Sequence, residues 1–432
     1  MTVGGKLTGN FPETAREEGL YYSSIRMSVL TLAICLLAAD PWPDFRGPRG
    51  DGTSEARDIP LAWSEASLVR WKTPIHGRGW STPAVGDGKV WLTTATEDGK
   101  EMSAVGVDLA TGRILLDLVL FRNESPQPLG NPVNSYASPS PVVEEGRVWV
   151  HFGSYGTACL DASTGKVIWE RRDLPCNHFR GPGSSPFLFG DLLILTMDGF
   201  DVQYLVALET GTGKTVWKTE RSFDFGDTDG DLRKAYSTPL VVRIGGEPVM
   251  FSPSAKAAYA YDPRDGRELW RIRYDGFSNA SRPVFGAGLV FINTGFGKAD
   301  LWAVRPDGRG DVTDTHVVWK CTQGVPLKPS PVVVGDLIFM GSDNGIATCL
   351  EAATGRQVWQ ARLGGDYSAS PLAGAGRVYF FSEEGKTTVI EPGRAFRVLA
   401  TSRLDAGFMA SPAVAGRALI LRTKTHLYRI ED

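Results

Sequence analysis

Short runs in which apolar and polar residues alternate recur along the chain. Residues 147–152 and 166–169 are typical, and their period of two predicts strands rather than helices. Pairs such as Gly190 and Asp191 separate one run from the next and suit the tight turns of hairpins. The pattern predicts an all-β protein built from many short strands.

One of these turns repeats with fixed internal spacing. Asp161 precedes Gly165 by four residues, and Trp169 follows that glycine by four. The acid can accept hydrogen bonds from free turn amides, and glycine tolerates a positive φ. The same spacing returns in residues 209–217, 262–270 and 351–359. Such a repeat predicts an array of small, similar units.

A second landmark is a small residue beside a proline, followed by a short apolar run. It recurs at Pro83, Pro141, Pro186, Pro239, Pro283, Pro331, Pro371 and Pro412. The mean spacing is about 47 residues, which suits a blade of four strands. A small residue fits the innermost strand of a blade, where neighbouring blades crowd the axis. We therefore predict an eight-bladed β-propeller of four-stranded blades.

The last repeat has room for only three strands after Pro412. A candidate for the missing strand lies near the N-terminus, because residues 69–73 resemble residues 216–219 and have no blade of their own upstream. Pairing the two ends of the chain removes the open edge of the array. We predict that this N-terminal strand completes the last blade and closes the ring.

Residues 1–39 are predicted to be an N-terminal extension plus a signal peptide. Arg26 precedes residues 27–39, an apolar stretch of signal-peptide length that ends in small residues. Cleavage after Ala39 leaves residues 40–432 as a single propeller domain. We expect this domain to be exported, either to the periplasm or in association with the cell envelope.

The cysteines are expected to be unpaired. Cys35 lies in the signal segment, and we do not expect a lipid anchor there because Ile34 stands where a lipoprotein signal needs Gly, Ala or Ser. The other four are expected to be buried free thiols, since their repeats lie too far apart around the ring for disulfide bonds. These four are Cys159, Cys176, Cys321 and Cys349.

Charge and composition exclude several partners. The formal net charge is −3 and no basic run occurs, which argues against a nucleic-acid groove. No apolar run after residue 40 is long enough to span a bilayer. The five histidines are scattered and no Cys-x-x-Cys pair occurs, so the sequence gives no support to a zinc site. We expect a monomer that binds a protein partner or a small anionic ligand.

The segments just before the marked prolines are expected to ring the mouth of the central channel. Their candidate ligand-binding residues are Arg78, Trp80, Asn134, Tyr136, His178, Arg180, Lys234, Tyr236, Asn279, Arg282, Lys328 and Tyr367, with Phe408 and Met409 beside them. The five cations of this set favour an anion-binding mouth. The alternative interpretation is structural, with each cation paired to a nearby acid or covering the channel with its aliphatic stem.

A second candidate site is a loop with four carboxylates within eight residues. They are Asp224, Asp227, Asp229 and Asp231, and their spacing partly resembles a calcium loop. The bidentate glutamate of an EF-hand is missing, so a solvated turn is the alternative interpretation. A weaker cluster, formed by Asp307, Asp311 and Asp314, is expected to be solvated.

The repeated acid, Thr-Gly and Trp pattern resembles the tryptophan-docking repeat of the pyrroloquinoline-quinone (PQQ) β-propeller family. That family contains quinoprotein alcohol dehydrogenases and the outer-membrane assembly lipoprotein BamB. Residues 42–48 also resemble the family's opening Trp-Pro-x-Tyr/Phe signature, and the resemblance extends over residues 42–430. It implies that each acid turn and tryptophan lock neighbouring blades together, which concerns the fold and not an activity.

The enzymatic features of that family do not carry over. Its dehydrogenases typically hold PQQ with an adjacent Cys-Cys disulfide, a stacking tryptophan, calcium ligands and an aspartate base. This chain has no Cys-Cys pair, and only Trp80 is expected near the axis. We therefore expect a BamB-like, non-catalytic binding scaffold without a cofactor. The alternatives are a PQQ-dependent dehydrogenase with an atypical, cationic site and a calcium-stabilised structural module.

Overall fold

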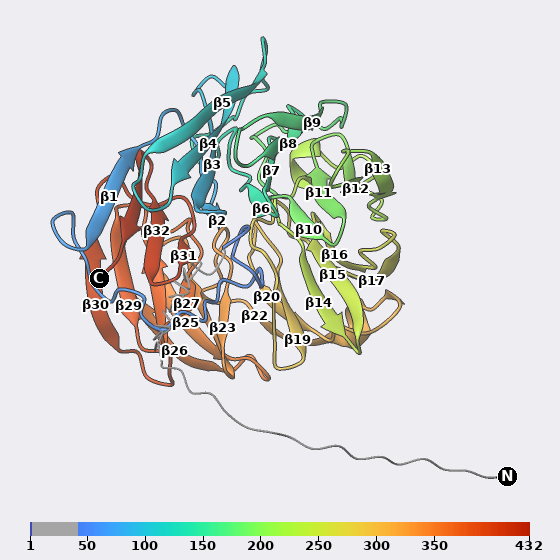
Figure 1. The fold of residues 1–432 in the computed structure, drawn as a ribbon. Helices are drawn as coiled ribbons and strands as arrows, with labels where there is room; N and C mark the ends of the chain where they lie inside the picture. The colour runs from blue at the N-terminus through green and yellow to red at the C-terminus, as the bar shows by residue number, and fades with distance from the viewer. Residues whose placement is uncertain (2–41) are drawn as a thin grey trace, which may run out of the picture. The chain divides into compact units, whose positions relative to one another are not determined.

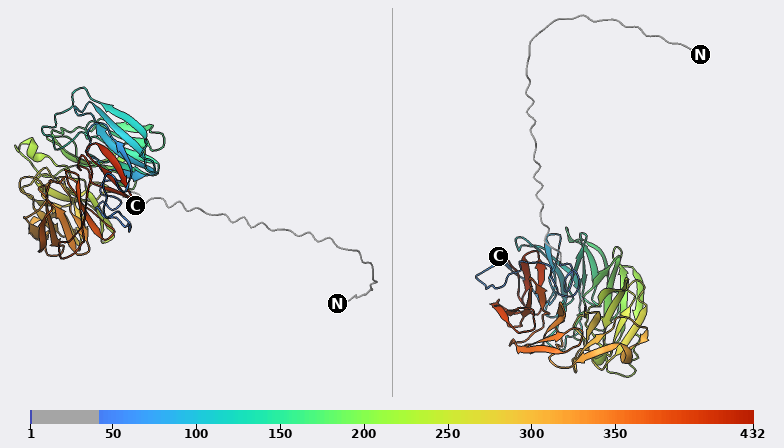
Figure 2. Two further views of the ribbon diagram at one scale, coloured as in Figure 1. Left: turned by 90° about the vertical axis from the view of Figure 1, so that its left-hand side faces the viewer. Right: turned by 90° about the horizontal axis from the view of Figure 1, so that it is seen from below.

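The structure is a computed structural model that describes Met1 and residues 42–432. Residues 42–432 form eight antiparallel sheets around a central axis (Figure 1). In Figures 1 and 2 the colour passes from blue through green and yellow to red around the ring, so blades that follow one another in sequence are neighbours in space. The predicted eight-bladed β-propeller is confirmed.

Each blade begins with a short strand beside the axis and continues outward. Blade 1 contains β2 (Ala84–Gly86), β3 (Lys89–Ala95), β4 (Glu101–Asp108) and β5 (Ile114–Arg122). Blade 2 contains β6 (Val142–Glu144), β7 (Arg147–His151), β8 (Thr157–Asp161) and β9 (Val167–Arg171). Blade 3 contains β10 (Phe187–Phe189), β11 (Leu192–Asp198), β12 (Gln203–Glu209) and β13 (Thr215–Glu220). Blade 4 contains β14 (Leu240–Ile244), β15 (Glu247–Pro253), β16 (Ala257–Tyr261) and β17 (Glu268–Arg273).

The second half of the ring repeats this arrangement. Blade 5 contains β18 (Val284–Gly286), β19 (Leu289–Asn293), β20 (Leu301–Val304) and β22 (Val317–Cys321). Blade 6 contains β23 (Val332–Val334), β24 (Leu337–Gly341), β25 (Ile346–Glu351) and β26 (Gln357–Arg362). Blade 7 contains β27 (Leu372–Gly374), β28 (Arg377–Phe381), β29 (Lys386–Ile390) and β30 (Val398–Arg403). Blade 8 contains β31 (Ala413–Ala415), β32 (Ala418–Arg422), β33 (His426–Ile430) and β1 (Val69–Pro74).

The N-terminal strand closes the ring. The strand β1 pairs antiparallel with β33, and Lys72 lies opposite Tyr428 in the register. Figure 1 shows this blue strand beside the red strands of the C-terminus. The predicted closure is confirmed, and it leaves blade 8 with the same number of strands as its neighbours.

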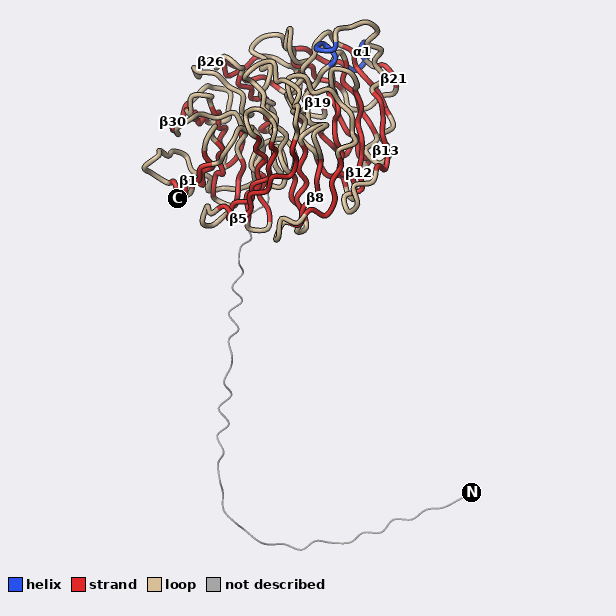
Figure 3. Tube along the Cα trace, turned by 90° about the horizontal axis from the view of Figure 1, so that it is seen from above, coloured by secondary structure: helices blue, strands red, loops and turns tan. Residues whose placement is uncertain are grey.

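The loop between β20 and β22 differs from the expected solvated loop. It contains the two-residue strand β21 (Gly310–Asp311), which pairs in parallel with β17 and gives blade 4 a fifth strand. Asp311 also forms an ion pair with Arg273 of blade 4 at 2.7 Å. The short helix α1 (Thr313–His316) follows it (Figure 3). Asp311 itself is exposed, as expected, although this loop of blade 5 covers the edge of blade 4.

The repeated turn and tryptophan join neighbouring blades at six of the eight junctions. Asp161 accepts hydrogen bonds from the amides of Ser163 and Thr164 at 3.1 and 2.8 Å, which holds the turn. The tryptophans of six outer strands donate their indole N–H to a turn carbonyl of the following blade. These pairs are Trp71 with Leu109, Trp169 with Thr210, Trp217 with Pro263, Trp270 with Pro306, Trp319 with Ala352 and Trp359 with Gly393. The blade-locking role that the resemblance implied is present.

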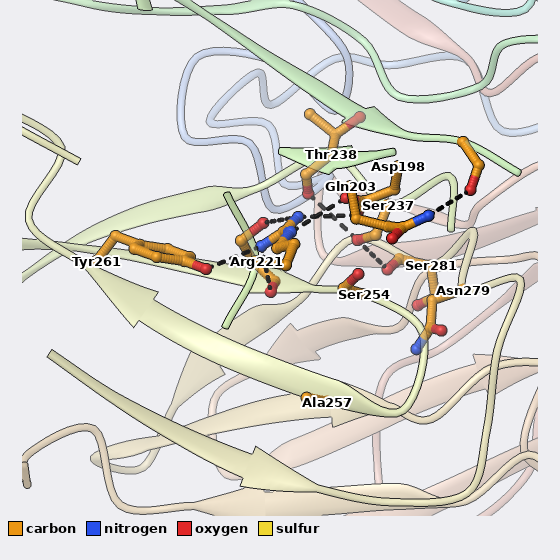
Figure 4. Close-up of polar contacts among 12 residues, drawn as sticks. Asp198, Gln203, Arg221, Ser237, Thr238, Ser254, Ala257, Tyr261, Asn279 and Ser281 are labelled. Atoms are coloured by element: carbon orange, nitrogen blue, oxygen red, sulfur yellow. Dashed lines mark hydrogen bonds and ion pairs between the residues drawn. The ribbon is translucent and has the colours of Figure 1, made fainter. Parts of the chain in front are cut away.

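A buried ion pair of blade 3 also contacts blade 4. Arg221 and Asp198 have side chains that are 1% and 0% exposed, and two hydrogen bonds of 3.1 and 2.9 Å join them (Figure 4). Arg221 also donates to Ser252 of β15 at 2.9 Å and lies over the ring of Tyr259. A buried charge of this kind is tolerated because its donors are satisfied on both blades.

The predictions on cysteines, membrane spans and export are tested only in part, because residues 2–41 lie outside the described residues. The cysteines 159, 176, 321 and 349 are free, as predicted, although Cys321 is only half-buried. Among residues 42–432 no helix is long and apolar enough to cross a membrane. The signal segment and Cys35 lie outside the described residues. The domain boundary at residue 40, the export and the lipid state therefore stay predictions.

Substituting the turn glycine tests the docking contact. Gly213 has φ +71°, and an added Cβ would lie 2.6 Å from the Trp169 ring. Gly88 has the same φ of +71° with nothing within 4 Å. We expect Gly88→Ala to lower the free energy of unfolding by about 1–2 kcal/mol through backbone strain alone. Gly213→Ala should cost about 1–3 kcal/mol more because of overpacking, as measured by urea denaturation. Equal losses would contradict the docking role.

Candidate functional site

The loops that precede the marked prolines surround a cavity of about 570 Å³ at one end of the axis. We call this cavity the channel mouth. Its lining comes from all eight connections between blades, so residues far apart in sequence meet there.

The wall is a ring of hydroxyl groups that we call the hydroxyl belt. It consists of the residue before seven of the eight prolines: Thr82, Ser140, Ser185, Thr238, Ser330, Ser370 and Ser411. In six places the amide of one belt position donates to the hydroxyl of the next, at 2.9–3.0 Å. These bonds run from blade to blade around the axis. All belt residues except Ser330 line the channel mouth.

The eighth belt position is Arg282, which has no hydroxyl. Its amide donates to Ser330, but its guanidinium donates to the carbonyls of Pro239 and Phe45. Its Nη1 lies 3.9 Å from a carboxylate oxygen of Asp44. The belt is thus interrupted where one side chain reaches the N-terminal segment.

The floor is that N-terminal segment, residues 42–54, which we call the plug. Trp42 exchanges backbone hydrogen bonds with Val85 of β2, and Ser54 donates to Ala373 of β27. Between them Arg46, which is 1% exposed, donates to the carbonyls of Pro331 and Pro371. The plug therefore lies against the inner strands of blades 1, 6 and 7 inside the ring (Figure 1). Phe45 of the plug lines the channel mouth.

The rim of the channel mouth is apolar and comes from five of the loops between blades and one turn within blade 5. Its members are Trp80, Val133, Phe277, Phe296, Leu327 and Met409. Phe296 and Val133 are 52% and 46% exposed. Phe277 and Phe296 meet edge to face at 5.6 Å, and the Trp80 indole donates to the Val133 carbonyl at 3.0 Å. Exposed aromatic groups held in place around a cavity are typical of a binding surface.

The charged groups of the channel mouth are paired. Arg180 and Asp231 form two hydrogen bonds of 2.8 and 2.7 Å. The guanidinium holds the pKa of Asp231 below its usual range. Lys328 lies 3.5 Å from Asp343 and 3.3 Å from Glu383. The alternative interpretation, in which each cation pairs with a nearby acid, holds for both cations that line the cavity.

Five of the twelve predicted ligand-binding residues line the channel mouth. They are Trp80, Asn134, Arg180, Tyr236 and Lys328. Asn134 donates to the carbonyls of Arg180 and Pro182 at 2.8 and 3.0 Å, so it fixes one loop of the rim. Met409 also lines the cavity, whereas Phe408 is buried against Phe381.

The other seven predicted residues do not line it. Arg78 stacks over Trp80 and donates to the Pro132 carbonyl. The remaining side chains are buried and bonded within the protein: Tyr136 to Gln127, Lys234 to Phe179, Asn279 to Asn293, and Arg282 to the plug. Tyr367 is 1% exposed. All seven residues lie in loops beside the channel mouth, but their side chains do not point into it.

His178 was a predicted mouth residue and is buried instead. It lies behind the wall with its Nδ1 3.6 Å from the Cys176 sulfur. Burial lowers the pKa of His178 well below its usual value, and the nearby Lys234 lowers it further. Burial also lowers the pKa of Lys234, to about 8. Neither side chain contacts the channel mouth.

The acidic loop does not form the predicted metal site. Asp224 accepts from the Gly226 amide, Asp229 caps the short helix η1 (Gly230–Arg233), and Asp231 pairs with Arg180. These carboxylates are used separately for turns and for one ion pair. In the part of the chain that the structure describes, no group of three or more His, Cys, Asp or Glu side chains is placed to hold a metal ion.

A protein-family model described as "Outer membrane protein assembly factor BamB" matches residues 118–258 and 205–431. The chain belongs to this family. A BamB of Yersinia pestis is 25% identical over 203 residues, which cover 43% of this chain and 48% of the relative. A BamB of Burkholderia pseudomallei is 30% identical over 112 residues, covering 26% and 29%. This BamB-family chain thus spans less than half the length of these curated relatives.

Solved structures support the same fold for the BamB family and for quinoproteins. BamB from Moraxella catarrhalis superposes with a TM-score of 0.58 at 12% identity, covering 84% of this chain and 98% of that one. A europium-containing methanol dehydrogenase gives a TM-score of 0.64 at 11% identity, covering 90% and 88%. At such low identity the likeness concerns the propeller and not the chemistry.

The residues of this BamB-family chain do not fit PQQ. Lys234 and Arg282, the cations expected to hold its carboxylates, are buried and donate to main-chain carbonyls. The lining cations Arg180 and Lys328 are already paired, and the described residues offer no metal-binding cluster. The atypical dehydrogenase alternative therefore lacks its site.

Several lining residues of this BamB-family chain were missed by the sequence reasoning. Phe45, Phe277, Phe296 and Leu327 lie in loops with no repeated spacing to mark them. The hydroxyl belt did leave a signal, because Ser or Thr precedes seven of the eight marked prolines. Its hydrogen-bonding role could have been proposed from that regularity.

The buried histidines predict a pH dependence of stability. Burial lowers the pKa of His151 to about 3 and that of His178 well below its usual value. Below about pH 6.5 the unfolded chain takes up protons that the folded chain does not, so stability is lost as pH falls. Each histidine should contribute up to about 1.4 kcal/mol per pH unit. Asp44, whose pKa burial raises to about 6, acts in the opposite direction.

Urea denaturation from pH 7 to pH 5 measures this dependence. The free energy of unfolding should fall with pH, and His178→Asn should reduce the slope whatever its effect on absolute stability. Equal slopes in the parent and the variant would show that His178 is not a buried neutral group.

Proposed function

We propose that this chain is an exported, non-catalytic scaffold that holds a segment of a protein partner in the channel mouth. The observation that carries the proposal is the apolar rim around a cavity whose floor is the plug. A segment that enters from the rim meets Phe45 and the hydroxyl belt. Because the plug forms a floor, the cavity can take a few side chains of a partner but not a strand that runs through the ring.

The chemistry of the channel mouth favours a protein segment over a ligand chosen by charge. Aromatic and apolar groups around a recessed centre are the usual anchors of protein interfaces. The belt hydroxyls and Asn134 supply polar partners for a backbone. Both lining cations have carboxylate partners, Arg180 in Asp231 and Lys328 in Asp343 and Glu383, so the expected preference for a small anion finds no support in the lining cations.

The relatives point to the same class of function. Proteins of the matching family are named for outer-membrane protein assembly. We therefore propose that the partner is a protein of the cell envelope and that residues 1–39 direct export. We also propose that the protein is a monomer and acts without PQQ or calcium.

A peptide selection tests it. The purified protein is used to select peptides from a random display library, and we expect enrichment of peptides with aromatic or aliphatic anchors and about micromolar affinity. Val133→Asp at the rim should weaken binding of a selected peptide by about 1–2 kcal/mol, because it places a charge in the apolar anchor site. Calorimetric titration gives the two affinities.

Val216→Asp is the matched control. Val216 is 54% exposed on β13, far from the channel mouth, and should tolerate the same change without loss of affinity. Equal losses in the two variants, or a loss only in Val216→Asp, would place the binding surface elsewhere. Dye-linked alcohol oxidation by the protein after addition of PQQ and calcium would contradict the non-catalytic reading.

A further inference from the structure

The hydroxyl belt holds protons that no group of residues 42–432 accepts. A serine or threonine hydroxyl can donate one hydrogen bond and accept two. Six belt hydroxyls accept from a neighbouring amide, yet none of them donates to another group of residues 42–432. Their side chains are at most 7% exposed. These regularly placed donors around one axis remain available to a group that enters the cavity.

Thr82 is the clearest case. It is 1% exposed and lines the channel mouth, and its hydroxyl has no hydrogen-bond partner among the described residues. With Ser140, Ser185, Thr238, Ser370 and Ser411 it is one of six belt residues that line the cavity. A group that satisfies them together must be rich in acceptors.

Three buried arginines lie close to the hydroxyl belt. Two of them donate hydrogen bonds to neighbours of belt residues, and the third occupies a belt position. Arg46 donates to the carbonyls that follow Ser330 and Ser370, and Arg422 donates to Ser81, the neighbour of Thr82. Arg282 occupies the eighth belt position itself. All three donate to main-chain oxygens, and only Arg282 has a carboxylate within 4.0 Å among the described residues.

Burial lowers the pKa of both Arg46 and Arg422 to about 9, which reflects positive charge held away from water. A nearby anion would offset that cost. The environment of the belt thus favours a negative acceptor over a neutral one, even though the charges of the rim are balanced.

We propose that the hydroxyl belt is an oxyanion subsite, which takes one carboxylate or phosphate group at the inner end of the channel mouth. The belt hydroxyls donate to its oxygens while their own oxygens keep accepting the blade-to-blade hydrogen bonds. The inference deepens the proposed function, since a bound segment would present a carboxylate here. The same chemistry would also hold a free small anion.

The experiment titrates acetate and inorganic phosphate separately into the purified protein by calorimetry. We expect saturable binding of at least one of them. Thr82→Val, which removes a hydroxyl without a protein partner and keeps the side-chain shape, should weaken binding about tenfold, as expected for a lost hydrogen bond to a charged group. Its melting temperature should stay near that of the parent.

Ser370→Ala and Ser330→Ala form a matched pair. Each removes the acceptor of one belt hydrogen bond, from Ser330 and from Arg282 respectively, so both should lower the melting temperature to a similar extent. Only Ser370 lines the channel mouth. Ser370→Ala should therefore weaken anion binding about tenfold while Ser330→Ala leaves it unchanged.

A selected peptide, made as its C-terminal acid and as its amide, identifies the source of the oxyanion. A tenfold preference for the acid that disappears in Thr82→Val assigns the subsite to a partner's carboxylate, and phosphate binding without that preference assigns it to a free anion. The subsite is refuted if neither anion binds and acid and amide bind equally. Peptide binding that persists in that case would leave the proposed function standing.

Discussion

The structure depends on one repeated interaction, the hydrogen bond from the amide of one belt position to the hydroxyl of the next. Each bond satisfies a buried N–H that the short inner strands leave unpaired, and an unsatisfied buried amide costs about 1–3 kcal/mol. Because the bonds run between blades, they fix the spacing of the inner strands around the axis. Tryptophans in six of the eight outer strands add contacts between blades far from the axis.

The interruption of the belt at Arg282 links the ring to its plug. A hydroxyl there would extend the belt, but the guanidinium instead reaches Phe45, while Arg46 reaches back to Pro331 and Pro371. The two arginines therefore tie the N-terminal segment to the starts of the inner strands of blades 4 to 7. As a result the channel mouth has a fixed floor, and the apolar rim surrounds a recess of defined depth.

The sequence predicted the fold well because propeller contacts repeat locally. The eight marked prolines were sufficient for the blade number, and the unpaired run at residues 69–73 was sufficient for the closure. The site was predicted less well, because loops carry no periodicity that tells whether a side chain points inward. Lys234 and Arg282 lie in mouth loops but turn into the protein, and the carboxylate partners of Arg180 and Lys328 come from other blades.

A crystal structure of the protein with a selected peptide tests the central claim most directly. The account predicts that the peptide enters the channel mouth between Val133 and Phe296, with an acceptor group facing the hydroxyl belt above Phe45. A peptide bound along an outer strand such as β13, with the channel mouth filled by water alone, would contradict it.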